Sequence, residues 1–156
     1  MKKISGTLAL SPKEAVLHFA DLHLDDAEFD LRTTFLPTED KLSVQSKLTA
    51  KGDIDEDTMI QLWPEIAAKG GHEWVADNIQ ELTLKNMWAQ LDFMLDADGA
   101  MKDPVLDGAF DIEDGQLIYL GKLPPITNLK ASATLNLLGM DFTIESGNIG
   151  QICLKK

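Results

Sequence analysis

Residues 48–79 read LTAKGDIDEDTMIQLWPEIAAKGGHEWVADNI, and they decide the fold because they form a helix-like interruption in a chain whose apolar residues otherwise recur mostly at every second position. Asp55 or Asp57 is suited to cap a first helical turn, because a carboxylate can accept a hydrogen bond from a free backbone N–H. Helices this short are not stable alone in water. We therefore predict a helical crossover at about residues 55–79 that lies on a β-sheet.

The crossover is predicted to be broken rather than continuous. The ring of Pro64 disfavours helical geometry at Trp63, so the first helix should end there. Gly70-Gly71 marks a second break, and Asn78 is placed to end the last helical piece in a left-handed conformation. We expect Trp63 and Trp74 to anchor the crossover to the sheet, because large aromatic side chains bury much apolar surface.

The clearest strand is residues 129–137, where leucine and alanine alternate with lysine, serine, threonine and asparagine. The alternation resumes at residues 140–145, so the two segments are predicted to form an antiparallel hairpin, with Gly139 supplying a positive φ angle. Strand-like alternation of the same kind precedes the crossover. This pattern predicts a sheet with one apolar face and one polar face.

Three irregularities are predicted within the strand-rich region. A bulge near Lys85-Asn86 reconciles the opposite parities of the apolar residues on its two sides. Asp114-Gly115 and residues 146–148 are interpreted as turns. With these turns we count roughly eight or nine strands, and we predict a β-rich α+β fold built on one strongly curved, mainly antiparallel sheet.

The 156-residue length is that of one ordinary domain. We predict a single domain over residues 1–156, with strands at about residues 3–50, the crossover at 55–79 and further strands at 82–154. The apolar run at the N-terminus is too short for a signal peptide, and no run reaches the eighteen apolar residues of a membrane-spanning helix.

The charge of the chain is strongly negative, because 14 Lys and Arg residues stand against 26 Asp and Glu residues, for a formal net charge of −12. A nucleic acid backbone would be repelled, so we predict no nucleic acid partner. Cys153 is the one cysteine, which excludes an intramolecular disulfide and a cysteine-built zinc site. These properties are typical of a well-solvated globular domain.

The sequence contains no motif that specifies a reaction. His18 and His23 point to opposite faces of one regular strand and His72 is distant in sequence, so we predict no metal. The acidic residues cluster at turns and at the start of the crossover, where they have capping and solvating roles. An enzyme would require carboxylates that converge in a pocket with shifted pKa values. We therefore predict no catalytic residues and no cofactor.

The crossover resembles the repeated segment of the AsmA-like envelope proteins, the group that includes YhdP and TamB. The resemblance rests on the pairs Trp63-Pro64, Trp74-Val75 and Asn78-Ile79, and on the Leu-Pro-Pro-Ile step of residues 123–126 with the strand pair that follows it. It covers roughly residues 42–152. The family pattern usually has a glycine shortly after the Asn-Ile pair, whereas this chain has Gln80-Glu81-Leu82.

The resemblance implies a module of a longer periplasmic protein that is anchored in the inner membrane of a Gram-negative cell and takes part in phospholipid transport to the outer membrane or in outer-membrane integrity. Phospholipid would move along a β-groove, and neighbouring repeats would join the open sheet edges. A groove of this kind would be lined by the apolar face of the sheet, for which the candidates are Leu91, Phe93, Leu129, Ala131, Ala133, Leu135, Met140, Phe142 and Ile144.

Two alternatives remain open from the sequence. The same apolar stripe also fits an ordinary core covered by a helix. The chain also fits a free-standing β-sheet protein that binds a small apolar ligand, which would be favoured if the terminal strands were capped and the sheet closed into a barrel.

Overall fold

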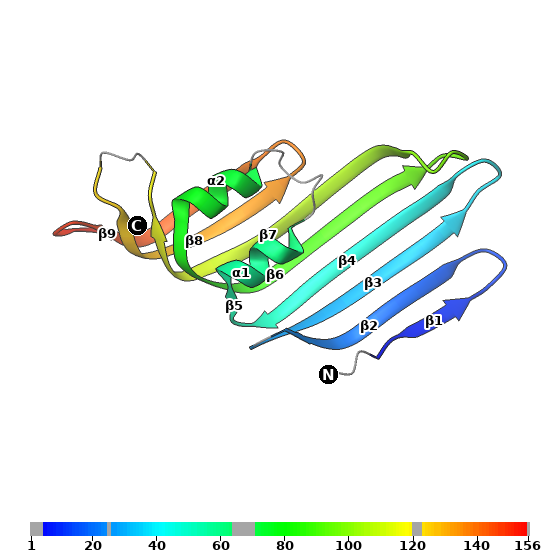
Figure 1. Ribbon diagram of the computed structural model, residues 1–156, viewed down its shortest axis with the longest axis horizontal. Coiled ribbons are helices and arrows are strands. Elements are labelled where there is room, and N and C mark those ends of the chain that lie inside the picture. Colours follow the sequence, from blue (N-terminus) through cyan, green and yellow to red (C-terminus); the bar gives the residue numbers. More distant parts are fainter. Residues whose placement is uncertain (1–4, 25, 64–70, 120–122, 156) are drawn as a thin grey trace.

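The fold is one large antiparallel sheet, seen in a computed structural model that describes residues 5–24, 26–63, 71–119 and 123–155. Within these residues the sheet has ten strands, in the order β1-β2-β3-β4-β6-β7-β8-β9-β10, with β5 paired to β6 (Figure 1). The strands are β1 (Thr7–Leu10), β2 (Ala15–Leu24), β3 (Ala27–Pro37), β4 (Leu42–Gly52), β5 (Ile54–Asp55), β6 (Ile79–Leu95), β7 (Met101–Leu117), β8 (Ile126–Asn136), β9 (Met140–Ile149) and β10 (Ile152–Lys155). This architecture confirms the predicted β-rich α+β class with a curved sheet.

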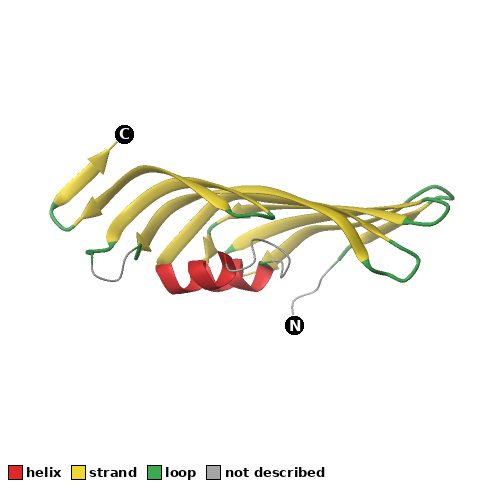
Figure 2. Ribbon diagram, turned by 90° about the horizontal axis from the view of Figure 1, so that it is seen from above, coloured by secondary structure: helices red, strands yellow, loops and turns green. Residues whose placement is uncertain are grey.

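The crossover connects β4 to β6 and contains two helices, α1 (Glu56–Leu62) and α2 (Gly71–Asn78). Because β4 and β6 are antiparallel neighbours, the crossover leaves and rejoins the sheet at the same end, opposite the β3–β4 and β6–β7 turns. Figure 2 shows the sheet arching over both helices, which therefore lie on its concave face. The helices cover only part of that face.

The first helix begins and ends as predicted. The side chain of Asp55 accepts a hydrogen bond from the backbone N–H of Thr58 at 2.8 Å, which makes Asp55 the N-cap. Trp63 has an extended conformation and ends the helix. Pro64 and the predicted break at Gly70 lie outside the described residues.

The prediction for the end of the second helix was wrong. Asn78 is the last residue of α2, its φ angle is not positive, and β6 follows at Ile79 without a turn. The carbonyl group of Asn78 accepts a hydrogen bond from the N–H of Ile118 at 2.7 Å. The end of α2 is therefore hydrogen-bonded to the residue that follows β7. The left-handed residue is Glu81, with φ 52°, in the segment where the AsmA-like pattern has a glycine.

Bulges explain why the sheet curves. The predicted bulge near Lys85-Asn86 is confirmed, because the β6–β7 register shifts between Lys85 and Trp88. Asn86 has a positive φ angle of 52° at this shift. The other described non-glycine residues with positive φ angles also lie at or beside register shifts, and they are Asp21, Glu81, Asp103 and Asn128. An extra residue bends its strand and increases the local twist, so bulges in β2, β6, β7 and β8 bend the sheet around the helices.

Two predicted turns are instead parts of long strands. Asp114-Gly115 lies inside β7, where Asp114 pairs with Thr83, and Ser146–Asn148 lies inside β9. In both places the glycine allows close packing: a Cβ atom on Gly115 would lie 3.2 Å from Ile112 Cγ2, and one on Gly147 would lie 2.6 Å from Ile126 Cγ2. The β9–β10 turn is instead at Gly150, which has φ 57°.

The β8–β9 hairpin is present, but Gly139 does not have the predicted positive φ. Asn136 closes the turn instead. Its side-chain oxygen accepts hydrogen bonds from the backbone N–H groups of Leu138 at 2.8 Å and Gly139 at 3.1 Å. An asparagine side chain can replace a backbone turn in this way, so the glycine is not needed for its conformation.

The core lies between the helices and the concave face. Leu84 is 0% exposed, and Phe29, Ile54 and Ile79 are also buried there. From the crossover, Met59 of α1 and Val75 of α2 belong to the same cluster. Burial of these side chains supplies most of the stabilisation that the short helices lack on their own.

Candidate functional site

The candidate site is the concave face of the sheet, whose side chains are mostly apolar across the width of the sheet, with Thr33 and Ser46 as polar exceptions. One line of directly paired residues illustrates this, running from β2 to β9: Phe19, Leu31, Leu48, Ala89, Gly108, Leu135 and Met140. The next line of paired residues points to the opposite face and is polar throughout: His18, Arg32, Lys47, Gln90, Asp107 and Asn136. Strand alternation therefore separates an apolar face from a wet face.

The structure places all the predicted groove residues on this concave face, but some of them are buried and others are partly exposed. Leu129, Ala131 and Ala133 lie in the buried core cluster beside the helices and are at most 3% exposed. The other candidates are half-buried, except Ile144, which is 37% exposed: Leu91, Phe93, Leu135, Met140 and Phe142. The two interpretations from the sequence, covered core and open groove, therefore apply to different parts of one face.

We call these parts the covered half and the open half. The covered half is the part of the concave face beside the crossover, and its side chains belong to the core: Phe29, Ala50, Leu82, Leu84, Ile112, Leu129 and Ala131. The open half lies toward the β1–β2, β3–β4 and β6–β7 turns, where Figure 2 shows no helix beneath the described strands. Its apolar side chains are Leu10, Ala15, Leu17, Phe35, Val44, Leu91, Phe93 and Leu106.

Most side chains of the open half remain in contact with water. Leu10, in the edge strand β1, is 73% exposed, and Leu17, Phe35 and Phe93 are half-buried. Val44 and Leu106 are buried. An extended exposed apolar surface of this kind marks a site of interaction.

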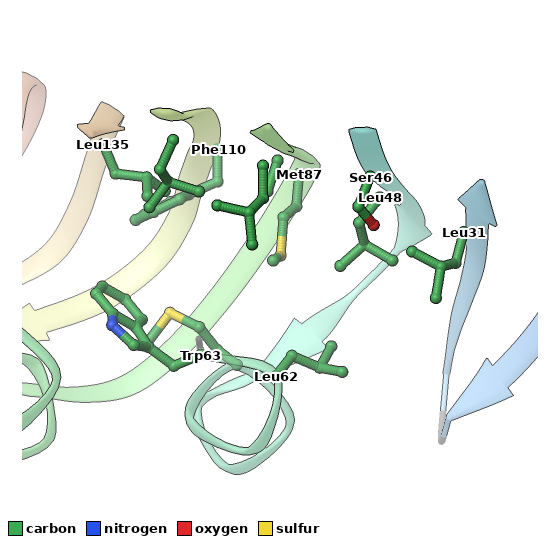
Figure 3. A pocket seen from close by; sticks show the side chains of 12 residues that line it. Leu31, Ser46, Leu48, Leu62, Trp63, Met87, Phe110 and Leu135 are labelled. Atoms are coloured by element: carbon green, nitrogen blue, oxygen red, sulfur yellow. The ribbon is translucent and has the colours of Figure 1, made fainter. Parts of the chain in front are cut away.

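A pocket of about 170 Å³ lies where the two halves meet (Figure 3). One side of the pocket is formed by strand residues of the concave face. The opposite side is formed by Met59, Leu62 and Trp63 of the crossover, which face the sheet. The lining residues are Leu31, Ser46, Leu48, Met59, Leu62, Trp63, Met87, Ala89, Leu91, Leu106, Phe110 and Leu135. The hydroxyl groups of Ser46 and Thr33 are hydrogen-bonded at 3.0 Å, so the one hydroxyl of the lining has a partner within the sheet.

The predicted anchoring role of Trp63 agrees with its position, because Trp63 is half-buried and packs against the core cluster. It also lines the pocket, which the sequence did not indicate. The side chain of Trp74 lies outside what the structure describes. The pocket residues of β3, β4 and β7 were also not predicted, because a strand pattern shows which residues share a face but not which strands become neighbours.

The convex face carries ion pairs. Lys85 Nζ lies 2.8 Å from Glu113 Oε2 and 3.6 Å from Asp53 Oδ1. The hydrogen bond to Glu113 raises the pKa of Lys85, and the same contact lowers the pKa of Glu113. His18 Nε2 lies 2.8 Å from Asp30 Oδ2. The bulge at Asp21 puts His23 on the same convex face as His18, so the prediction that these two histidines point to opposite faces was wrong. All of these groups are partly exposed, where ion pairs contribute little to stability.

The described residues contain no group of three or more His, Cys, Asp or Glu side chains placed to hold a metal ion. No helix among them is long and apolar enough to cross a membrane. The pocket lining has no charged residue in the described chain. The chemistry that this face supports is contact with apolar molecules.

Both edges of the described sheet are open, at β1 and β10. The apolar face reaches both edges, where Leu8 is 61% exposed and Ile152 is 65% exposed. Of the two C-terminal lysines, Lys155 is the last residue of β10 and is exposed.

Comparison with known proteins found no matching family, curated protein or solved structure.

Proposed function

We propose that this chain is a noncatalytic module that holds the hydrocarbon chains of phospholipid on its concave face, as part of an AsmA-like envelope protein. The observation that carries the proposal is the continuous apolar face, which runs from β1 to β10 and is left uncovered in its open half. The wet convex face would keep the module in water while the acyl chains are shielded. The family, the periplasmic location and the inner-membrane anchor of the parent protein rest on the resemblance of the crossover and of the Leu-Pro-Pro-Ile step with the strand pair that follows it.

The energetics of an open face suit movement better than tight retention. Complete burial of one methylene group contributes about 0.8 kcal/mol, and a chain lying on a surface buries roughly half of its own surface. Each methylene group would then contribute about 0.4 kcal/mol, spread evenly along the strands. Apolar contacts are not directional, so an acyl chain could shift along the face without breaking specific bonds.

The open edges support the second part of the proposal, that neighbouring repeats of the parent chain extend the groove. Unpaired backbone groups at a sheet edge are a template for a further strand. Because the apolar side chains continue to Leu8 in β1 and Ile152 in β10, added strands would prolong the apolar face without a polar gap.

The lipid assignment is tested by extracting the purified chain and analysing the extract by mass spectrometry, together with crosslinking in cells. A photo-reactive amino acid at Leu135 or Phe142 should crosslink to phospholipid. The same group at Thr134 or Thr143, which neighbour these positions but point to the convex face, is the matched control. Absence of phospholipid from the extract and of lipid crosslinks at both concave positions would refute the proposal.

Membership of a longer AsmA-like protein is tested on the parent reading frame. A transmembrane helix before this segment and further similar repeats would support the proposal. A complete gene that ends at Lys156 would contradict it.

A second candidate function, binding of one small apolar molecule, is favoured by the pocket between α1 and the sheet. The condition set for it is not met in the described residues, where the sheet is open and β1 and β10 are edges. Recovery of a single small apolar compound at one molecule per chain, without phospholipid, would favour this function over the groove.

A further inference from the structure

We propose that the pocket beneath α1 receives the methyl end of one hydrocarbon chain, so that the crossover forms a stop at one end of the open half. This inference rests on the proposed lipid-binding function and adds an orientation to it. The methyl end would lie against Trp63, and the polar end of the same molecule would lie toward the strand turns. The rest of the chain would lie over Leu91 and Phe93.

The lining of the pocket selects for hydrocarbon. No charged residue lines it among the described residues, and the hydroxyl group of Ser46 already bonds to that of Thr33. A carboxylate or phosphate group placed there would lose its hydration without gaining a partner, which costs several kcal/mol. Water is also disfavoured, because a buried water molecule needs about two to four polar partners. An alkyl segment has no such requirement.

The volume sets how much of a chain can enter. A cavity of about 150 Å³ with aliphatic and aromatic walls holds one benzene molecule. The 170 Å³ of this pocket therefore accommodates about six carbon atoms. Only the end of an acyl chain fits, and the remainder must lie outside the pocket.

The open half continues from the pocket in a straight line. Leu91 belongs to the pocket lining, and Phe93 and Leu95 follow it on the same face of β6. From Ala89 to Leu95 the strand extends about 20 Å at 3.3 Å per residue. One leaflet of a bilayer contributes about 15 Å of hydrocarbon, half of the 30 Å core. The length from Ala89, in the pocket wall, to Leu95 therefore accommodates one acyl chain whose methyl end lies in the pocket.

The orientation is tested by fluorescence quenching. In a protein carrying Trp74→Phe and Trp88→Phe, Trp63 is the one remaining tryptophan. Stearic acid with a nitroxide near its methyl end should quench Trp63 at least twofold more strongly than stearic acid with the nitroxide near its carboxyl group. Equal quenching, or the reverse order, would overturn the pocket inference while leaving lipid binding intact. Absence of quenching by both probes, with no lipid recovered from the purified protein, would overturn both proposals.

A second measurement uses a filled pocket. Ala89→Leu adds three carbon atoms to the pocket wall and should weaken binding of unmodified stearic acid about tenfold. Ala109→Leu makes the same change on the convex face of the neighbouring strand β7, and it should leave the affinity unchanged. Equal effects of the two variants would count against the pocket. Should Ala89→Leu fail to fold, the quenching order at Trp63 decides the question alone.

Discussion

The covered half and the open half of the concave face share strands β3, β4, β6 and β7, with the same alternation of side chains, but they differ in exposure. Leu84 in the covered half is 0% exposed, whereas Phe93, on the same strand and the same face in the open half, is half-buried. The difference comes from the crossover, which packs against one half and not the other. Alternation therefore defines a face, and a separate segment of the chain decides whether that face is core or surface.

The largest expected effect separates the two halves by stability. Leu84→Ala should lower the free energy of unfolding by about 2–5 kcal/mol, because it leaves a cavity in the buried core. Leu91→Ala makes the same change on the same strand and face, but Leu91 is half-buried, so we expect a loss of about 1 kcal/mol. Urea denaturation of both variants measures the difference. Equal losses would show that the open half is covered in solution.

The next effect separates the halves by binding. Phe93→Asp places a charge where a hydrocarbon chain is proposed to lie, and it should reduce the phospholipid recovered per protein at least about tenfold. Met94→Asp is the control, because Met94 is also half-buried and is adjacent in β6 but points to the convex face. Lipid analysis of the purified variants gives the ratio. Equal lipid content in the two variants would remove the open half from the proposed site.

A third effect concerns the attachment of the crossover. Asp55→Ala should cost about 1 kcal/mol, because α1 loses its N-cap, whereas Asp55→Asn retains a capping oxygen and should cost much less. Hydrogen bonds from the hydroxyl group and then the backbone N–H of Thr58 lower the pKa of Asp55. The pKa of Asp55 is thus lower in the folded protein than in the unfolded chain. The ionised carboxylate therefore stabilises the protein above about pH 4, and this stabilisation is lost as the pH falls below that value.

Urea denaturation at neutral pH and near pH 3 tests this dependence. The stability difference between the natural protein and Asp55→Asn should move toward zero or change sign at the lower pH. A difference that stays constant with pH would show that the Asp55 carboxylate does not contribute through its charge.

The smallest effect concerns the curvature that brings the sheet around the helices. Glu81 has φ 52°, a left-handed conformation that a side chain disfavours by about 1–2 kcal/mol. Glu81→Gly should therefore raise the free energy of unfolding by about 0.5–1 kcal/mol. Gln80→Gly, at the preceding position with an ordinary φ angle, should lower it by a similar amount. A loss of stability in Glu81→Gly would show that the glutamate side chain has a packing role that outweighs its backbone strain.

Local features of the fold were predictable from the sequence where a residue type or a spacing has one main structural role. Asp55 has the position of a helix cap, Pro64 follows the residue at which α1 ends, and the change of parity at Lys85-Asn86 requires a bulge. Each of these expectations follows from geometry within a few residues, and the structure confirms each one.

Glycine was a less reliable guide because it serves two purposes. Gly115 and Gly147 allow close packing inside strands, whereas Gly139 was expected to need a left-handed conformation and does not. The division of the concave face was also beyond sequence reasoning. Leu129 and Leu135 belong to one strand and one pattern, but only Leu129 is fully buried beside the crossover.

The strand order has a consequence for folding. Strands that are neighbours in the sheet are also neighbours in the chain, apart from the crossover between β4 and β6. Most pairings therefore close short loops, which keeps their entropic cost low and favours rapid, local assembly. Each strand between β1 and β10 in the sheet order is held by at least two partners, and β6 by three, whereas β1 and β10 are each held by one. Amide hydrogens should exchange fastest in β1 and β10, so an outer strand can detach and exchange partners while the core around β6 and β7 stays folded.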